Sequence, residues 1–319
     1  MQFDVDRRTI LLVRHGSYAY GLNTPQSDED FKGVCIKPKE AYFGFVQRFE
    51  QQFEHMGSKT DGVDKVVYSL DKFVKLAADC NPNIIEVLHV DDFDVLTCDA
   101  FGEELRDKRN DFISKKAKHT FSGYAHTQLK RIKTHREWIT NPPTEPPSRE
   151  KFGLSAETKL SPSELGAAQA QWKSELEMQQ AGLPKNLITL YTKEHQYQAA
   201  ATRWTQYQTW LKTRNPARAN LELKFGYDTK HGSHLIRLMR MCKEIMSGMG
   251  VIVKRPDREE LLAIKMGGRE LDSLIEEAER LVAECDELYV TSHLRKEPDR
   301  AMLDAWLVDL TDRYLTKHG

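Results

Sequence analysis

The chain has 319 residues, enough for two modest domains or for one domain with an added helical half. Its 47 Lys and Arg residues nearly balance its 48 Asp and Glu residues, so the formal net charge is −1. The net charge therefore does not favour binding to nucleic acid, and any such contact has to come from a local basic patch. The sequence has no long apolar run, so no membrane-spanning helix is expected.

The 5 cysteines are odd in number and scattered, without a Cys-x-x-Cys pair. This usage predicts reduced, mostly buried thiols. The N-terminal residues lack the charged-then-apolar pattern of a secretory signal. We therefore expect a cytoplasmic protein that does not associate with membranes.

The apolar run at residues 10–13 predicts a short strand that is buried on both faces. It ends at Gly16 and Ser17, where glycine lets the backbone approach a ligand and serine can open a helix. Free N–H groups at a helix start attract an anion, most usefully a phosphate. This corner is therefore a candidate phosphate site.

Two carboxylates follow the corner. Residues 23–25 predict a turn, and Asp28 and Asp30 then lead into an apolar run at 31–36. On a strand, residues i and i+2 point to the same face, so both carboxylates could share magnesium ions. Either motif alone is common in ordinary loops and turns, but this order of strand, Gly-Ser, turn and Asp-x-Asp indicates phosphoryl or nucleotidyl transfer.

The stretch from Gly16 to Asp30, continued by residues 32–34, resembles the signature of the DNA polymerase β-like nucleotidyltransferase superfamily. It is most similar to a subfamily associated with RNA ligases and predicted to act in RNA repair. The resemblance continues through residues 64–73 and 81–83. Weaker similarities follow at residues 121–124 with 128–129, at 226–230 and at 261–268. The resemblance thus covers most of the chain outside a central insertion.

This resemblance implies a site that binds a nucleotide and two Mg²⁺ ions, with Mn²⁺ as an alternative. Gly16 and Ser17 would hold the phosphates, and Asp28 and Asp30 would bind the metal. We include Tyr20, which lies in the same motif, among the nucleotide-binding residues. A third metal-binding carboxylate is expected from a neighbouring strand.

The third carboxylate is predicted at Asp64. Residues 63–69 alternate as in a strand, and an acidic residue inside such a run is unusual. An ordinary strand-edge aspartate is the alternative, and Glu50 and Glu54 compete for the role if the strand is misplaced. After this strand, residues 73–80 have the spacing of a helix, and residues 84–90 form an apolar segment to which we assign no chemistry.

We expect an α+β fold, in which a small mixed β-sheet nucleotidyltransferase core with helices precedes a mainly helical C-terminal domain. The core is predicted over residues 1–110 and the helical domain over 111–319, with a polar inserted arm near 141–215. The first long helix carries basic residues, which can follow a nucleic acid backbone, and between them Phe121 and Tyr124, which can stack on bases. For most of its lysines, a solvated helix face is the simpler interpretation.

A second candidate region begins at residues 227–230, before a strongly amphipathic helix. Lys230, His234 and Arg237 recur at i, i+4 and i+7, so they predict a cationic stripe able to neutralise a triphosphate or pyrophosphate. A solvated basic edge is the alternative for each residue. No Cys or carboxylate lies at ligand spacing from His231 and His234, so zinc is not predicted.

The predicted activity is transfer of a nucleoside monophosphate from a nucleoside triphosphate, such as ATP, to a hydroxyl on an RNA end resembling that of a tRNA. The RNA acceptor and a functional link to an RNA ligase depend mainly on the resemblance. The alternatives are adenylylation of a protein or small molecule, or a non-catalytic nucleotide- or RNA-binding partner of an RNA ligase. A P-loop NTPase is not expected, because the Gly-x-x-x-x-Gly-Lys-Ser/Thr motif is absent.

Overall fold

The structure is a computed structural model that describes residues 3–25, 27–57, 62–157, 160–214 and 216–318. Two compact units divide it: a larger one, Met1–His135 with Leu221–Gly319, and a smaller one, Arg136–Asn220. The larger unit holds a small mixed sheet followed by helices, so the predicted α+β class is confirmed. The domain boundary expected near residue 110 stays a prediction.

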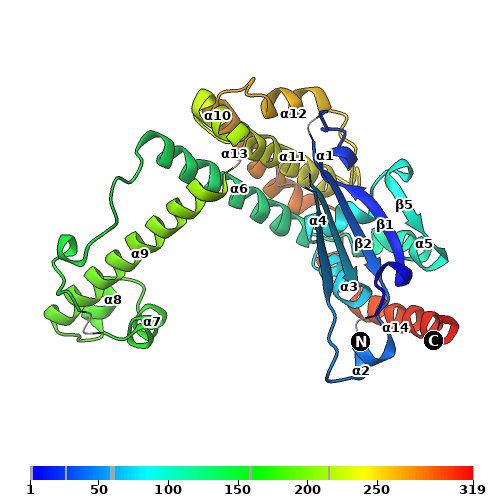
Figure 1. Ribbon diagram of the computed structural model, residues 1–319, viewed down its shortest axis with the longest axis horizontal. Coiled ribbons are helices and arrows are strands. Elements are labelled where there is room, and N and C mark those ends of the chain that lie inside the picture. The colour runs from blue at the N-terminus through cyan, green and yellow to red at the C-terminus, as the bar shows by residue number, and fades with distance from the viewer. Residues whose placement is uncertain (1–2, 26, 58–61, 158–159, 215, 319) are drawn as a thin grey trace. The chain divides into compact units, whose positions relative to one another are not determined.

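The sheet of the larger unit has 5 strands in the order β3-β4-β2-β1-β5. Their bounds are β1 Thr9–His15, β2 Glu29–Cys35, β3 Gln51–Met56, β4 Val63–Ser69 and β5 Val95–Cys98. The pair β2 and β4 is parallel and the other neighbours are antiparallel. The strands are drawn as arrows in Figure 1.

The strands predicted from apolar patterns are present, with one informative difference. β4 has the predicted bounds, whereas β2 begins at Glu29, before the apolar run expected to start at residue 31. The hydrogen bonds of the sheet therefore extend past the apolar residues and include Asp30 in the strand. This extension fixes the Asp30 backbone within the ladder.

The larger unit also contains most of the helices. The early ones are short: α1 Gly16–Ala19, α2 Lys39–Phe43, α3 Leu70–Ala78, α4 Pro82–Leu88 and α5 Ala100–Asp107. The later ones are α11 Thr229–Met246, α12 Arg258–Lys265, α13 Leu271–Thr291 and α14 Arg300–His318. Two more helices, α6 Lys116–Thr140 and α10 Pro216–Phe225, belong to it in part, because the division between the units falls within each of them. Short 3₁₀ turns lie at Asp6–Arg8, Asp92–Asp94 and Lys108–Phe112.

The core of the larger unit joins the sheet to these helices. α3 contacts β2 and β4, while α4 and α5 contact β1. α3 ends at Ala78, and Asn81 caps α4, because the Asn81 side chain accepts a hydrogen bond from the Asn83 backbone N–H. The predicted apolar stripe of α11 is buried, and α11 packs against α12 and α13. One hydrophobic cluster thus supports both the sheet and α11.

The smaller unit contains α7 Pro162–Gln171, α8 Glu175–Gln180 and α9 Lys185–Thr213, with a 3₁₀ turn at Arg149–Phe152. The segment from Pro142 to Pro147 is non-helical, as its prolines predict. Glu194 is buried on α9, where the Arg149 guanidinium binds it through both carboxylate oxygens. Among the described helices, none combines the length and the apolar character needed to cross a bilayer.

Candidate active site

The sheet register places four polar side chains in one row across its strands. His15 on β1 pairs with Asp30 on β2, Asp30 pairs with Asp64 on β4, and Asp64 pairs with His55 on β3. Directly paired residues project from the same face of a sheet. The parallel pairing of β2 and β4 therefore brings together two carboxylates that are far apart in the sequence.

The Asp64 carboxylate also has a defined partner in this row. Its Oδ1 atom lies 2.7 Å from Nδ1 of His55, and the Asp64 side chain is 48% exposed. The imidazole thereby holds one oxygen of Asp64 on an open part of the sheet. Glu54, one of the competing carboxylates, pairs with Lys65 in the β3–β4 register, one position from Asp64, so it projects from the opposite face.

A backbone corner lies directly against Asp30. β1 ends at His15, and α1 begins at Gly16, which has φ +66°. A Cβ atom at this position would overlap Oδ2 of Asp30, so only glycine permits both the backbone conformation and the close approach. Gly16 and Asp30, which the sequence predicts to act together, are therefore in contact, with Ser17 next in α1.

The charges around Asp30 are mixed. Burial raises the pKa of Asp30, and the carboxylates of Asp64 and Asp28 add to this, while Lys230 and Lys32 oppose it. Asp28 lies in the exposed loop before β2, and Lys230 is exposed at the start of α11. The predicted residues Asp28, Asp30, Asp64 and Lys230 thus form one electrostatic group.

A buried network centred on Glu86 lies next to this group. Glu86, on α4, has no exposed surface. Its Oε2 accepts a hydrogen bond of 2.5 Å from the Tyr20 hydroxyl, and its Oε1 accepts one of 2.6 Å from Nη1 of Arg237. Nε2 of His15 lies 3.3 Å from the same Oε2. Burial would raise the pKa of Glu86, but Arg237, His15 and Tyr20 together outweigh burial and hold that pKa far below its usual range.

Three of the predicted nucleotide-binding residues belong to this network. The Arg237 guanidinium lies 3.7 Å from the centre of the Tyr20 ring and is only 1% exposed. Its Nη2 is 3.0 Å from Nδ1 of His234, whose pKa burial and Arg237 lower to about 3. The predicted cationic stripe is therefore not one continuous surface, because Lys230 is exposed whereas Arg237 is buried.

Several residues of this region have no role predicted from the sequence pattern. They are His15, Lys32, His55, Asn83 and Glu86. Lys32 shares a face with Asp30, and its Nζ lies 3.3 Å from Oδ1 of Asn83. Burial lowers the pKa of Lys32 to about 8, with Arg237 contributing in the same direction. The signal for Glu86 was present, since it is the one acidic residue in the apolar segment 84–90, and a buried carboxylate needs a partner.

A basic cavity of about 470 Å³ lies beside the same corner. It is lined by Arg14, Tyr18, Gly21, Asn23, Phe93, Asp94, Lys254, Arg255 and Arg258. The Phe93 ring is 78% exposed, and Nζ of Lys254 lies 6.0 Å from its centre. The Arg14 guanidinium lies 5.3 Å from the Tyr18 ring. Cations and aromatic faces thus line one cavity that shares α1 with the Gly16 corner.

Residues 2–141 match the model of a family described as the RNA repair pathway DNA polymerase beta family. The predicted resemblance is confirmed for this part of the chain. The polymerase β-like part contains Gly16, Asp28, Asp30 and Asp64, but not α11.

Two further similarities were found. An Enterobacteria phage T4 protein, described as an uncharacterized 38.9 kDa protein in the nrdC-mobD intergenic region, is 32% identical over 133 residues. The match covers 38% of this chain and spans only 38% of the length of the phage protein. A solved nucleotidyltransferase-like protein from Exiguobacterium sibiricum 255-15 aligns with 89% of this chain and 69% of that chain, with 9% identity and a TM-score of 0.25.

Proposed function

We propose that this protein is a metal-dependent nucleotidyltransferase that transfers a nucleoside monophosphate from a nucleoside triphosphate to a hydroxyl on an RNA end. The observation that carries the proposal is the register pair of Asp30 and Asp64 beside the Gly16 corner. All three residues lie in the part of the chain that matches a polymerase β-type family.

Asp28, Asp30 and Asp64 would hold the metal, two Mg²⁺ ions or Mn²⁺ in their place. Their oxygens are the hard donors that Mg²⁺ prefers, and the crowding of like charges at Asp30 fits a cationic ligand. When bound, the metal lowers the pKa of the attacking hydroxyl and offsets the charge of the triphosphate. His55 holds the Asp64 carboxylate in place through its 2.7 Å contact.

The nucleotide's phosphates would be bound by Ser17 and Lys230. Lys230 is exposed and is the strongest cationic influence on Asp30, so a phosphate near Asp30 would also be near this ammonium group. Tyr20, His234 and Arg237 belong to the buried network around Glu86 and would act as positioning residues that do not contact the nucleotide. Through Glu86 they link the end of α1 to α11, the two helices that carry Ser17 and Lys230.

The acceptor would be an RNA end bound in the basic cavity beside α1. Arg14, Lys254 and Arg258 can contact phosphates, and the exposed Phe93 ring offers a stacking surface for a base. The family description places its members in an RNA repair pathway, so we also propose that this protein works together with an RNA ligase.

Purified protein, α-³²P-labelled nucleoside triphosphates, Mg²⁺ and an RNA pool would test the activity. We expect labelled RNA, with a loss of at least about 10³-fold in the combined variant Asp28→Asn and Asp30→Asn, because the metal's stabilisation of the transition state is removed. Glu40→Gln, a change at an exposed carboxylate of α2, is the matched control and should keep full activity.

Resolving the labelled products by size separates the possible acceptors. Label on a protein or on a small molecule would replace the RNA assignment and leave the nucleotidyltransferase proposal standing. Undiminished transfer in the double variant would overturn the proposed role of these carboxylates.

A further inference from the structure

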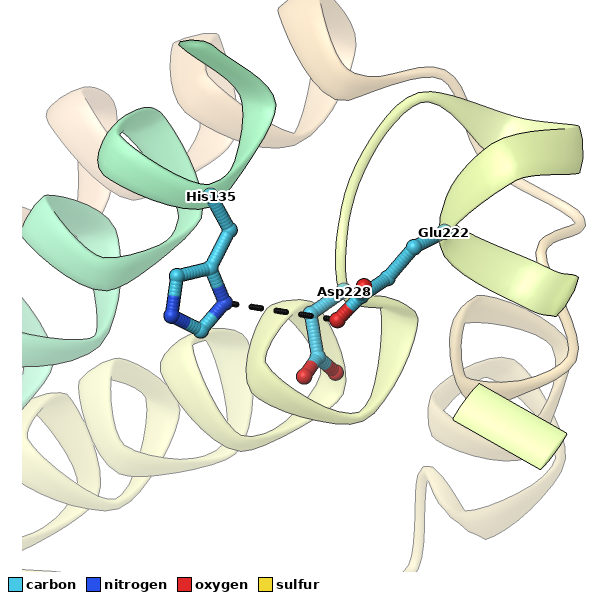
Figure 2. A group of neighbouring side chains, drawn as sticks. All are labelled: His135, Glu222 and Asp228. Atoms are coloured by element: carbon cyan, nitrogen blue, oxygen red, sulfur yellow. Dashed lines mark ion pairs between the residues drawn. The ribbon is translucent and has the colours of Figure 1, made fainter. Parts of the chain in front are cut away.

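Three side chains from two distant parts of the sequence lie close together in the larger unit. His135 comes from α6, Glu222 from α10, and Asp228 immediately precedes α11. One ligand atom from each of them lies within 4.8 Å of the others. Figure 2 shows these side chains, with the 4.0 Å pair of His135 Nδ1 and Glu222 Oε1 dashed.

A second imidazole lies at the edge of this cluster. Nε2 of His231 is 3.5 Å from Oδ2 of Asp228, and the ring centres of His231 and His135 are 6.1 Å apart. The other oxygen of Asp228, Oδ1, accepts a hydrogen bond from the backbone N–H of His231 and so caps α11. Gly226, with φ +77°, permits the turn that brings Glu222 and Asp228 together.

The donor set is enclosed and chemically mixed. Glu222 is 2% exposed and Asp228 is 4% exposed, while the side chains of His135 and His231 are 16% and 18% exposed. Imidazole nitrogens with carboxylate oxygens suit Zn²⁺ and similar divalent ions, whereas Mg²⁺ prefers oxygen alone. Two buried carboxylates side by side also favour a cation between them.

From this arrangement we infer that His135, Glu222, Asp228 and His231 form a binding site for a divalent transition metal of the Zn²⁺ class. It is distinct from the proposed Mg²⁺ site at Asp28, Asp30 and Asp64. In tetrahedral coordination with bonds of about 2.0–2.1 Å, neighbouring ligand atoms lie roughly 3.3 Å apart. The 4.0 Å separation of His135 and Glu222 would therefore close by roughly 0.7 Å.

Zinc is not predicted at His231 from the sequence, where no carboxylate was expected at ligand spacing. That conclusion is wrong for Asp228, whose Oδ2 lies 3.5 Å from His231 Nε2. The other donors are separated from His231 in sequence and meet it only after α6, α10 and α11 have packed. A bound ion would cross-link these three helices within the larger unit.

Metal content and Zn²⁺ affinity of the full-length, untagged protein test this inference. After removal of metals with a chelator, we expect the protein to rebind one equivalent of Zn²⁺ at this site and its melting temperature to rise. The binding should persist in the variant Asp28→Asn with Asp30→Asn, which separates it from the proposed catalytic site. Co²⁺ in place of Zn²⁺ should give the absorption bands of a tetrahedral site.

The decisive variants remove ligands without removing structure. Asp228→Asn keeps a residue that can cap α11, and the pair His135→Gln with Glu222→Gln keeps side-chain size. Each should weaken Zn²⁺ binding by more than the 10–100-fold that loss of an outer-shell partner typically costs. His126→Gln, an exposed position on α6, is the matched control. Absence of Zn²⁺ binding to the wild type, or unchanged affinity in folded Asp228→Asn, would overturn the inference.

Discussion

Two groups of charged residues in the larger unit use similar side chains in opposite ways. In the open row, Asp30 and Asp64 are neighbouring like charges at a site reached by solvent. In the buried network, Glu86 faces Arg237 at 2.6 Å and also binds Tyr20. A buried ion pair whose two charges offset each other helps to fix the packing of the helices that carry it. Neighbouring like charges near the surface are instead suited to binding a ligand of opposite charge. Residue type alone therefore does not identify a binding residue.

Breaking the buried pair should have the largest effect on stability. Glu86→Leu leaves the Arg237 guanidinium buried without its carboxylate, so we expect the free energy of unfolding to fall by about 3–5 kcal/mol. Urea denaturation measures it. The double variant Glu86→Leu with Arg237→Met should lose less than the single one, because no buried charge remains. Glu103→Leu, at an exposed position on α5, should stay within about 0.5 kcal/mol of the wild type.

A loss of less than about 1 kcal/mol in Glu86→Leu would contradict the distinction between the two groups, since it would mean that Glu86 is not essential for burying Arg237.

Acid should destabilise the same network through His15. Burial lowers the pKa of His15 to about 4, with Lys32 and Arg237 acting in the same direction and Glu86 opposing them. The folded state therefore holds His15 neutral, while the unfolded chain protonates it near pH 6.5. The stability present above pH 6.5 should be lost as the pH falls to 4, by about 3 kcal/mol. Urea unfolding from pH 7 to 4 measures this loss, and His15→Phe should remove that part of the slope.

The Gly16 corner should tolerate no side chain. In Gly16→Ala, the positive φ and the overlap with the Asp30 carboxylate should together lower the free energy of unfolding by about 1–3 kcal/mol. Gly123 offers the opposite case, because it lies within α6 and no atom would come within 4 Å of a new Cβ. Gly123→Ala should therefore stabilise the protein by about 0.5–1 kcal/mol in the same thermal or urea experiment. Equal effects at the two positions would contradict this interpretation of the corner.

The smallest expected effect is a stabilisation at Asp30. Burial and the neighbouring carboxylates raise the pKa of Asp30, so the charged form is disfavoured in the folded state. Asp30→Asn removes the cost of burying this charge and its repulsion from Asp64 and Asp28, which together exceed the attraction of Lys230 and Lys32, so it should raise the free energy of unfolding by about 0.2–1 kcal/mol at pH 7. Destabilisation by Asp30→Asn would show that Asp30 has a structural partner instead of crowded like charges.

Much of the sheet could be predicted from sequence because its central strands are apolar. Residues 10–13 and 63–69 carry patterns that fit β1 and β4. β3 was not predicted, since its residues are mostly exposed and polar and it pairs only along one edge. Missing β3 also meant missing His55, which lies opposite Asp64.

Local spacing could not distinguish the positions within the α11 stripe. Lys230, His234 and Arg237 share one side of the helix, yet their environments differ from exposed to fully buried. What separates them is Glu86, which is 151 residues away from Arg237 along the chain. The same limit applies to His135 and Glu222, whose proximity depends on how α6 and α10 pack. Contacts of this kind are set by tertiary structure and leave little trace in the periodicity of either segment.

Metal binding at Asp30 and Asp64 is the decisive property to measure. Mn²⁺, followed by electron paramagnetic resonance in the presence of a non-hydrolysable nucleoside triphosphate, should bind to the wild type and to Glu222→Gln alike. The combined variant Asp30→Asn with Asp64→Asn should lose this nucleotide-dependent binding while remaining folded. Undiminished Mn²⁺ binding in that variant would contradict the account, because the carboxylates paired across β2 and β4 would then not be the ligands.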